Sequence, residues 1–179
     1  LHHLGEVTYF SPLADTSLPD VGFVYLPGGY PELYLAALSA NRQMLQSIRR
    51  YVESGGKLLA ECGGMMYLCD EIRDKNGDVY PMAGVLHQSA TMENMKLRLG
   101  YRTLLYNETR LKGHEFHYSR LVEQQNPLPS CAVAYTAKGV ETDTPLYHYK
   151  NVWAGYTHLY WADPVGNEWF TKFVIDGNT

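Results

Sequence analysis

The feature that most constrains this 179-residue chain is a short apolar run that ends in a cysteine followed by two glycines. Residues 57–61 form the apolar run, and an amphipathic stretch follows Cys62. The run is typical of a buried parallel strand, and the stretch beyond it is typical of a helix. We therefore expect Cys62 at a sharp strand-to-helix turn, a place where enzymes expose a nucleophile.

The residues that follow Cys62 suit a thiol nucleophile. Gly63 and Gly64 leave room for a substrate, and backbone N–H groups at such a turn can point at a reacting carbonyl. The partial positive charge at the start of the following helix would favour the thiolate. The alternative is a buried structural cysteine beside a flexible turn, which is the commoner state of an isolated Cys-Gly-Gly.

Length, charge and cysteine content narrow the class of protein. A chain of 179 residues suits one domain with a substantial core. The net charge of −4, without a Lys/Arg cluster, argues against nucleic acid or an anionic membrane as the main partner. Three cysteines without regular spacing, no membrane-spanning apolar run and no signal-peptide pattern predict a cytoplasmic protein.

The first half of the chain has the pattern of a parallel α/β protein. Strands are predicted over residues 6–10 and 21–26, and a helix is predicted over residues 41–54. Strands and helices alternate, and this alternation is typical of a parallel sheet. Its ligands bind at the carboxyl ends of strands, so we expect the loop at residues 27–32 to lie near Cys62.

The second half has the pattern of a series of strands followed by one helix. The expected strands cover residues 97–106, 110–118, 132–137 and 153–161. The last of them carries His158 near its end. Asp163 is the expected N-cap of a final helix, with Pro164 at its first position. These strands predict a mixed sheet.

Six motifs occur in order along nearly the whole chain and resemble those of one enzyme family. The motifs are Phe10-Ser11-Pro12-Leu13, Leu26-Pro27-Gly28-Gly29-Tyr30-Pro31-Glu32, Glu61-Cys62-Gly63-Gly64-Met65, Leu99-Gly100-Tyr101-Arg102, Gly113-His114-Glu115-Phe116-His117-Tyr118-Ser119 and Gly155-Tyr156-Thr157-His158. Together they resemble the glutaminase domain of the cobyrinate a,c-diamide synthases, a branch of the class I glutamine amidotransferases. The resemblance implies a flavodoxin-like α/β fold, with a mostly parallel mixed sheet flanked by helices, in one domain over residues 1–179.

The resemblance also implies an activity, the hydrolysis of glutamine to glutamate and ammonia. Cys62 matches the family's nucleophile and His158 the histidine that activates it. A thiol nucleophile does need a base within hydrogen-bond reach and a later proton donor for the leaving ammonia. Backbone N–H groups of Gly28 or Gly29 and of Gly63 are the expected oxyanion donors.

Part of the implied activity requires a second domain. In the family, ammonia passes to a synthetase domain that uses ATP and Mg²⁺ to amidate the a- and c-carboxylates of cobyrinate. No G-x-x-x-x-G-K-[ST] phosphate loop occurs here, so we expect that domain outside this chain. The resemblance also implies one more strand before the equivalent of Leu1, which we expect outside this chain as well. The expected partners are glutamine, the synthetase domain with its corrinoid acceptor, and a second copy in a homodimer. No cofactor or metal is expected in the domain itself.

One position departs from the class I pattern. Class I amidotransferases carry a glutamate two residues after the catalytic histidine, where this chain has Tyr160. The corrinoid branch lacks that carboxylate, which leaves the orientation of His158 without an assigned partner. Glu32 and Glu61 flank the site in sequence, and neither is assigned as a base.

The remaining histidines and cysteines have ordinary structural interpretations. His114 and His117 are three residues apart in a predicted strand and point to opposite faces, which argues against a shared metal. Their motif keeps His117 and Tyr118 as residues that could line the site, with structural hydrogen bonding as the alternative. Cys69 and Cys131 are expected to be buried.

Three alternative functions remain open. The glutaminase domains of cobyric acid synthase and of a diamide synthase acting on a nickel tetrapyrrole share the same design. A non-catalytic domain that only docks a synthetase is a further alternative. The presence of both Cys62 and His158 argues against this last one.

Overall fold

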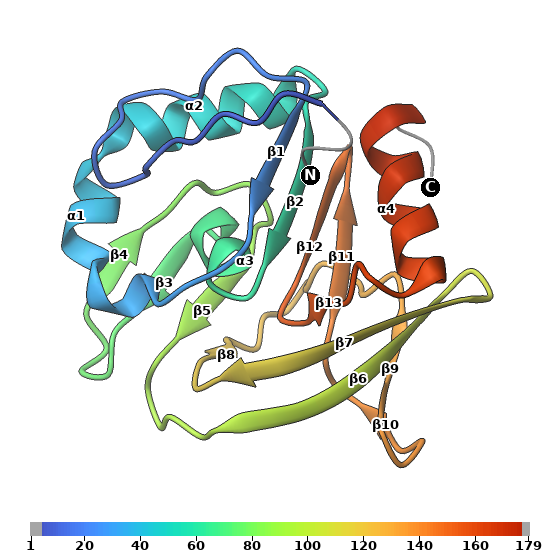
Figure 1. Cartoon of the computed structure of the whole chain (residues 1–179). Helices are drawn as coiled ribbons and strands as arrows, with labels where there is room; N and C mark the ends of the chain where they lie inside the picture. The colour runs from blue at the N-terminus through green and yellow to red at the C-terminus, as the bar shows by residue number, and fades with distance from the viewer. Residues whose placement is uncertain (1–4, 177–179) are drawn as a thin grey trace.

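A mixed sheet of four strands forms the centre of the molecule, in a computed structural model that describes residues 5–176. Its strands, in spatial order, are β1 (Phe23–Leu26), β2 (Lys57–Glu61), β12 (Val152–Gly155) and β11 (Leu146–Tyr149). The β1–β2 and β2–β12 pairs are parallel, and β11 is antiparallel to β12. The expected mostly parallel mixed sheet is therefore confirmed (Figure 1).

Two further sheets account for the other strands. An antiparallel sheet has the order β10 (Glu141–Thr142), β9 (Val133–Thr136), β6 (Arg98–Tyr106), β7 (Thr109–His117) and β13 (His158–Leu159). A small sheet has the order β4 (Val79–Pro81), β3 (Glu71–Arg73), β5 (Ser89–Thr91) and β8 (Arg120–Leu121). The predicted hairpin of β6 and β7 is confirmed, but it belongs to its own sheet rather than to the central one.

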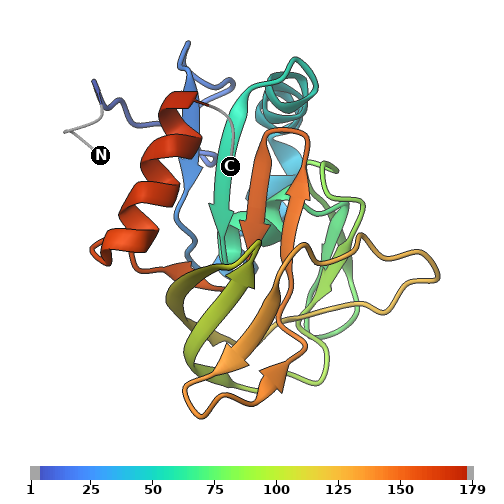
Figure 2. The same ribbon diagram turned by 90° about the vertical axis from the view of Figure 1, so that its right-hand side faces the viewer.

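Helices cover both faces of the central sheet. They are the 3₁₀ turn η1 (Pro31–Leu33), α1 (Leu35–Ala40), α2 (Arg42–Glu53), α3 (Gly63–Leu68) and α4 (Pro164–Asp176). The side chain of Asn41 accepts a hydrogen bond from the N–H of Met44 and so starts α2 at the predicted place. Two perpendicular views show α4 on one face of the sheet and α2 on the other (Figures 1 and 2).

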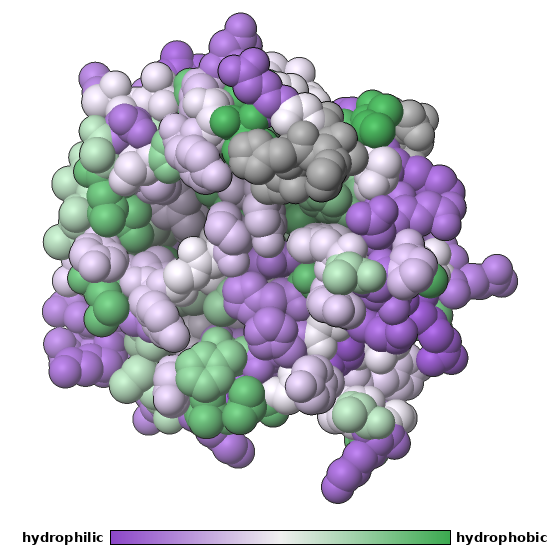
Figure 3. All heavy atoms as spheres, in the orientation of Figure 1, coloured by the Kyte–Doolittle hydropathy of each residue, from purple (hydrophilic) through white to green (hydrophobic). Residues whose placement is uncertain are grey.

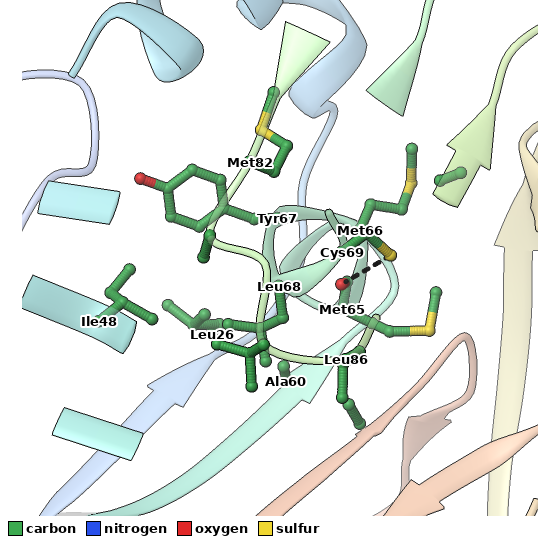
Figure 4. Packing of buried hydrophobic residues seen from close by; sticks show 14 of the residues in the cluster. Leu26, Ile48, Ala60, Met65, Met66, Tyr67, Leu68, Cys69, Met82 and Leu86 are labelled. Atoms are coloured by element: carbon green, nitrogen blue, oxygen red, sulfur yellow. Dashed lines mark hydrogen bonds between the residues drawn. The ribbon is translucent and has the colours of Figure 1, made fainter. Parts of the chain in front are cut away.

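The core has two parts, one on each face of the central sheet. One joins Val24 and Leu58 to apolar residues of α1, α2 and α3. In it α3 is buried on all sides, and Met65, Leu68 and Cys69 pack around its axis (Figure 4). The other part joins alternate residues of the same strands to α4 and to the antiparallel sheet. Successive side chains of β1 and β2 point to opposite faces of the sheet and so contribute to both parts of the core.

Two sequence predictions about strands are wrong. Residues 6–10 form no strand, because within the described chain no neighbouring strand pairs with them. Residues 153–161 do not form one strand. The chain leaves the central sheet after Gly155 and joins the antiparallel sheet at His158, so two short strands belong to different sheets.

Within residues 5–176, no helix has the length and apolar character needed to cross a bilayer. The additional first strand expected before Leu1 lies outside the described residues.

Candidate active site

Cys62 lies at the predicted turn between β2 and α3. Its backbone has φ 50° and ψ −111°, a conformation that non-glycine residues rarely adopt and that is found at functional sites. Its N–H donates to the carbonyl of Gly155 at 2.8 Å, which fixes the turn against β12. Cys62 is 6% exposed, and its Sγ lies 4.0 Å from the carbonyl oxygen of Phe116.

Glycines allow the loop after β1 to approach this turn closely. A Cβ atom on Gly28 would lie 3.0 Å from Cε1 of His158 and 3.4 Å from Cβ of Cys62. A Cβ on Gly63 would lie 2.5 Å from the carbonyl oxygen of Gly29. The three glycines predicted to supply oxyanion donors therefore lie at the turn, and side chains at Gly28 and Gly63 would push the loop away.

His158 reaches Cys62 from a different sheet. It lies on the two-residue strand β13, paired with His114 of β7, and the two imidazole rings stack with centroids 5.2 Å apart. The thiol of Cys62 lies close enough to the imidazole to be the largest cause of its raised pKa. The two residues singled out from the sequence thus meet where the central and antiparallel sheets join.

The charge state of His158 is set by its two partners. The hydrogen bond to Cys62 and then that to Glu61 raise its pKa from 6.5 to about 10, although burial acts in the opposite direction. The ring is therefore protonated at neutral pH. An imidazolium next to a thiol favours the thiolate, and it can later donate a proton to a leaving amine.

Glu61 provides the carboxylate beside His158. Its Oε2 lies 3.5 Å from Nδ1 of His158 and accepts a hydrogen bond from the hydroxyl of Tyr25 at 2.8 Å. Its Oε1 accepts the backbone N–H of Leu159 at 3.0 Å. The sequence analysis left Glu61 without a role and His158 without an orienting partner, and Tyr160 is 59% exposed. The sequence does not reveal this contact, because it depends on the chain leaving β12 in the central sheet and joining β7 at His158.

His117 lies in a buried polar cluster behind the site. Its ring stacks on Tyr156 at 3.8 Å between centroids, and its Nδ1 lies 2.9 Å from the carbonyl oxygen of Ser119. Glu115 is fully buried, and Nη2 of Arg102 lies 2.9 Å from its Oε2. Burial opposes ionisation of Glu115, but hydrogen bonds from neighbours including His117 hold its pKa below the usual value.

The other candidate residues lie outside the contact between Cys62 and His158. Tyr118 is 41% exposed and packs edge-on against Phe116. His114 is exposed and His117 is buried, so the prediction that they face opposite sides of the strand is confirmed. Cys69 is buried, as expected, and Cys131 is half-buried. Within residues 5–176, no group of three His, Cys, Asp or Glu side chains is placed to hold a metal ion.

A cavity of about 260 Å³ lies next to the turn. It is bordered by the chain at residues 10–13, by the loop at residues 27–31 and by the start of α3. Tyr25 lines it as well. Gly63 and Gly64, which follow Cys62, line this cavity, whereas Cys62 and His158 do not.

An exposed apolar surface borders the site on the antiparallel sheet. We define it as the exposed side of the β6–β7 hairpin and the residues before it, namely Met95, Leu97, Leu99, Tyr101, Phe116 and Tyr118. A hydrophobic patch lies over the start of β6 and the end of β7 (Figure 3). The carbonyl of Phe116 faces Cys62, so this β6–β7 surface starts at the edge of the site.

Comparison with known proteins identifies the family. The family described as the CobB/CobQ-like glutamine amidotransferase domain matches residues 1–165. The chain belongs to this family. A solved glutamine amidotransferase superposes on this domain with a TM-score of 0.53 at 16% sequence identity, over 86% of this chain and 79% of that chain, and so supports the fold.

The curated relatives of this glutamine amidotransferase domain are longer proteins. It is 40% identical to the hydrogenobyrinate a,c-diamide synthase of Pseudomonas aeruginosa, over 89% of this chain and 36% of that protein. It is 38% identical to the cobyrinate a,c-diamide synthase of Fusobacterium nucleatum, over 89% of this chain and 37% of that protein. The corresponding enzyme of Salmonella typhimurium is 35% identical, over 88% and 36%. The chain thus spans little more than a third of these relatives.

Proposed function

We propose that this domain hydrolyses glutamine and supplies the ammonia for ATP-dependent amidation of the a- and c-carboxylates of cobyrinate. The observation that carries the proposal is the strained turn at Cys62, hydrogen-bonded to a protonated His158. A thiol at a strand-to-helix turn, paired with a histidine, is the arrangement used for nucleophilic acyl transfer.

The chemistry follows from these two side chains. The sulfur of Cys62 attacks the side-chain amide carbon of glutamine, and the carbonyl π electrons move to the oxygen. When that tetrahedral intermediate collapses, the C–N bond breaks, and His158 protonates the departing nitrogen to release ammonia. A glutamyl thioester remains. Water, deprotonated by His158, attacks the thioester, and the C–S bond breaks to release glutamate and restore the thiolate of Cys62 beside protonated His158. Backbone N–H groups of Gly28 or Gly29 and of Gly63 would stabilise the oxyanion, each by about 3 kcal/mol.

The names of the relatives favour a corrinoid acceptor. Relatives with 35–40% identity are named for a,c-diamide synthesis on cobyrinate or hydrogenobyrinate. These names favour a,c-amidation over the alternatives of cobyric acid or a nickel tetrapyrrole. We assign ATP and Mg²⁺ to the synthetase portion, because the chain has no phosphate loop. The three free cysteines favour a cytoplasmic location.

The synthetase portion also has a candidate place on this domain. Ammonia leaves at Cys62, and the β6–β7 surface begins at that point. Exposed apolar surface of this kind marks interaction sites. We assign the synthetase portion to the β6–β7 surface, where it would cover the exit of the site.

The test compares Cys62→Ala with Cys131→Ala in the protein as its gene encodes it. Glutamate release and glutamine-dependent amidation should be lost in Cys62→Ala, while amidation with free ammonia continues. Cys131→Ala removes another free thiol and should keep glutaminase activity. Glutamate release that survives in Cys62→Ala would contradict the nucleophile assignment. A wild-type protein that releases no glutamate would favour a non-catalytic docking domain.

A further inference from the structure

We propose that Glu61 is the positioning residue of this site, the carboxylate that sets the orientation and the tautomer of His158. The inference rests on the proposed glutaminase function and adds a third residue to it. Glu61 directly precedes Cys62 in the chain, so one strand end would supply both the nucleophile and the group that orients its partner.

The His158 ring has two neighbouring partners, Glu61 and Cys62. Nδ1 lies 3.5 Å from Oε2 of Glu61, and the ring also makes a hydrogen bond with the thiol of Cys62. A histidine that transfers protons through one nitrogen must hold its other proton elsewhere. Contact of Nδ1 with a carboxylate places that proton on Nδ1 and leaves Nε2 for the thiol.

Glu61 is positioned so that it cannot act on the substrate directly. The residue is 3% exposed, and both of its oxygens are occupied. Oε1 accepts the N–H of Leu159, and Oε2 accepts the hydroxyl of Tyr25. Glu61 therefore acts through His158 rather than as a base toward glutamine or water.

Charge gives a second reason to pair these residues. An ionised carboxylate at this depth needs a cationic partner, because an unpaired buried charge costs several kcal/mol. Among residues 5–176, the cationic group within ion-pair distance of Glu61 is His158. The ionisable groups that face His158 are Glu61 from the end of β2, Cys62 from the turn after it and His114 from β7.

Two neighbours hold the carboxylate still. The N–H of Leu159 belongs to the residue after His158, so the same carboxylate contacts both the backbone and the ring of β13. Tyr25 fixes the other oxygen from β1, and burial, followed by the charge of Glu61, raises the pKa of its hydroxyl, which keeps it a donor. A carboxylate held at both oxygens can define a ring orientation.

The decisive variant is Glu61→Gln. It keeps an oxygen for the N–H of Leu159 but replaces the charge with an amide that donates to Nδ1 of His158, which places the ring proton on the wrong nitrogen. We expect kcat for glutamate release to fall about 10²- to 10³-fold, somewhat less than the loss known for a serine triad, with KM for glutamine unchanged. By NMR, the pKa of His158 should fall from about 10 toward 6.5.

Controls separate this inference from the proposed function. Glu53→Gln removes a surface carboxylate on α2 and should leave kcat and its pH profile unchanged. If Glu61→Gln keeps wild-type kcat and His158 titration while Cys62→Ala is inactive, the positioning role is overturned and the glutaminase function stands. If Cys62→Ala keeps its activity, the glutaminase function itself fails.

A second measurement does not depend on how Glu61→Gln folds. In Cys62→Ala the carboxylate remains, and ¹⁵N chemical shifts report the tautomer of neutral His158. The positioning role requires the proton on Nδ1. A proton on Nε2 would overturn it, whatever the behaviour of Glu61→Gln.

Discussion

The proton that His158 holds links the stability of the fold to pH. The hydrogen bond to Cys62 and then that to Glu61 raise its pKa in the folded protein to about 10, against 6.5 for an unperturbed histidine. A raised pKa stabilises the folded state, fully below pH 6.5, and this stabilisation is lost as pH rises through 10.

We therefore predict a pH-dependent difference between the wild type and His158→Gln. Urea denaturation at pH 6, 8 and 10 should show the largest difference in free energy of unfolding at pH 6 and the smallest at pH 10. A difference that grows with pH would show that His158 is not held in the charged state.

At the same scale, the sequence predicted the candidate residues Cys62 and His158 better than the contacts that support them. Cys62, His158 and the glycines were predicted because turns, glycine pairs and motifs are local features. Glu61 was not, because its contact with His158 joins residues 97 positions apart through a crossing that no periodicity encodes. His117 was kept as a site-lining candidate because of its place in the Gly-His-Glu-Phe-His-Tyr-Ser motif, but its ring packs on Tyr156 behind the site.

At the scale of elements, the position of Cys62 depends on how closely α3 packs against β1. A Cβ on Gly64 would lie 2.3 Å from the carbonyl oxygen of Leu26, a backbone atom that cannot rotate away. The first turn of α3 can pack this closely against β1 only because Gly64 has no side chain.

We predict that Gly64→Ala lowers the free energy of unfolding by about 1 to 3 kcal/mol, because overpacking forces the helix away from the strand. Glutaminase activity should fall with it, since Cys62 precedes this turn. Gly22→Ala is the matched control, because a Cβ there meets nothing within 4 Å. Equal melting temperatures for the two variants would contradict the close approach.

Element types were largely predictable, whereas their membership of sheets was not. The apolar spacing in residues 41–54 predicted α2, and the Asp163-Pro164 pair predicted the start of α4. Alternation over residues 153–161 could not reveal that the chain changes sheets at Tyr156 and Thr157. Residues 6–10 have the sequence pattern of a strand but do not form one, because a strand also needs a neighbouring strand to hydrogen-bond with.

At the scale of the whole molecule, the exposed apolar residues of the β6–β7 surface determine how the isolated chain behaves in solution. Leu99 is 62% exposed and lies opposite Phe116 in the hairpin, close to the site. Apolar surface of this kind associates when its natural partner is absent. We therefore expect the 179-residue chain alone to self-associate, with a homodimer as one form, and to release glutamate more slowly than the complete protein.

Leu99→Glu should shift the isolated chain toward monomer in light scattering. Val140→Glu, at an equally exposed position on the turn between β9 and β10, should not. A wild-type chain that is monomeric and turns over glutamine as fast as the complete protein would show that no partner is needed to complete the site.

The crossing between β12 and β13 has a mechanical consequence. Cys62 follows a strand of the central sheet, and His158 belongs to the antiparallel sheet. The distance between the sulfur and the imidazole therefore depends on how the two sheets are aligned. A change of one ångström in such a distance typically alters a rate about a hundredfold. A small rotation of one sheet against the other would therefore change the separation of Cys62 and His158 without altering either side chain.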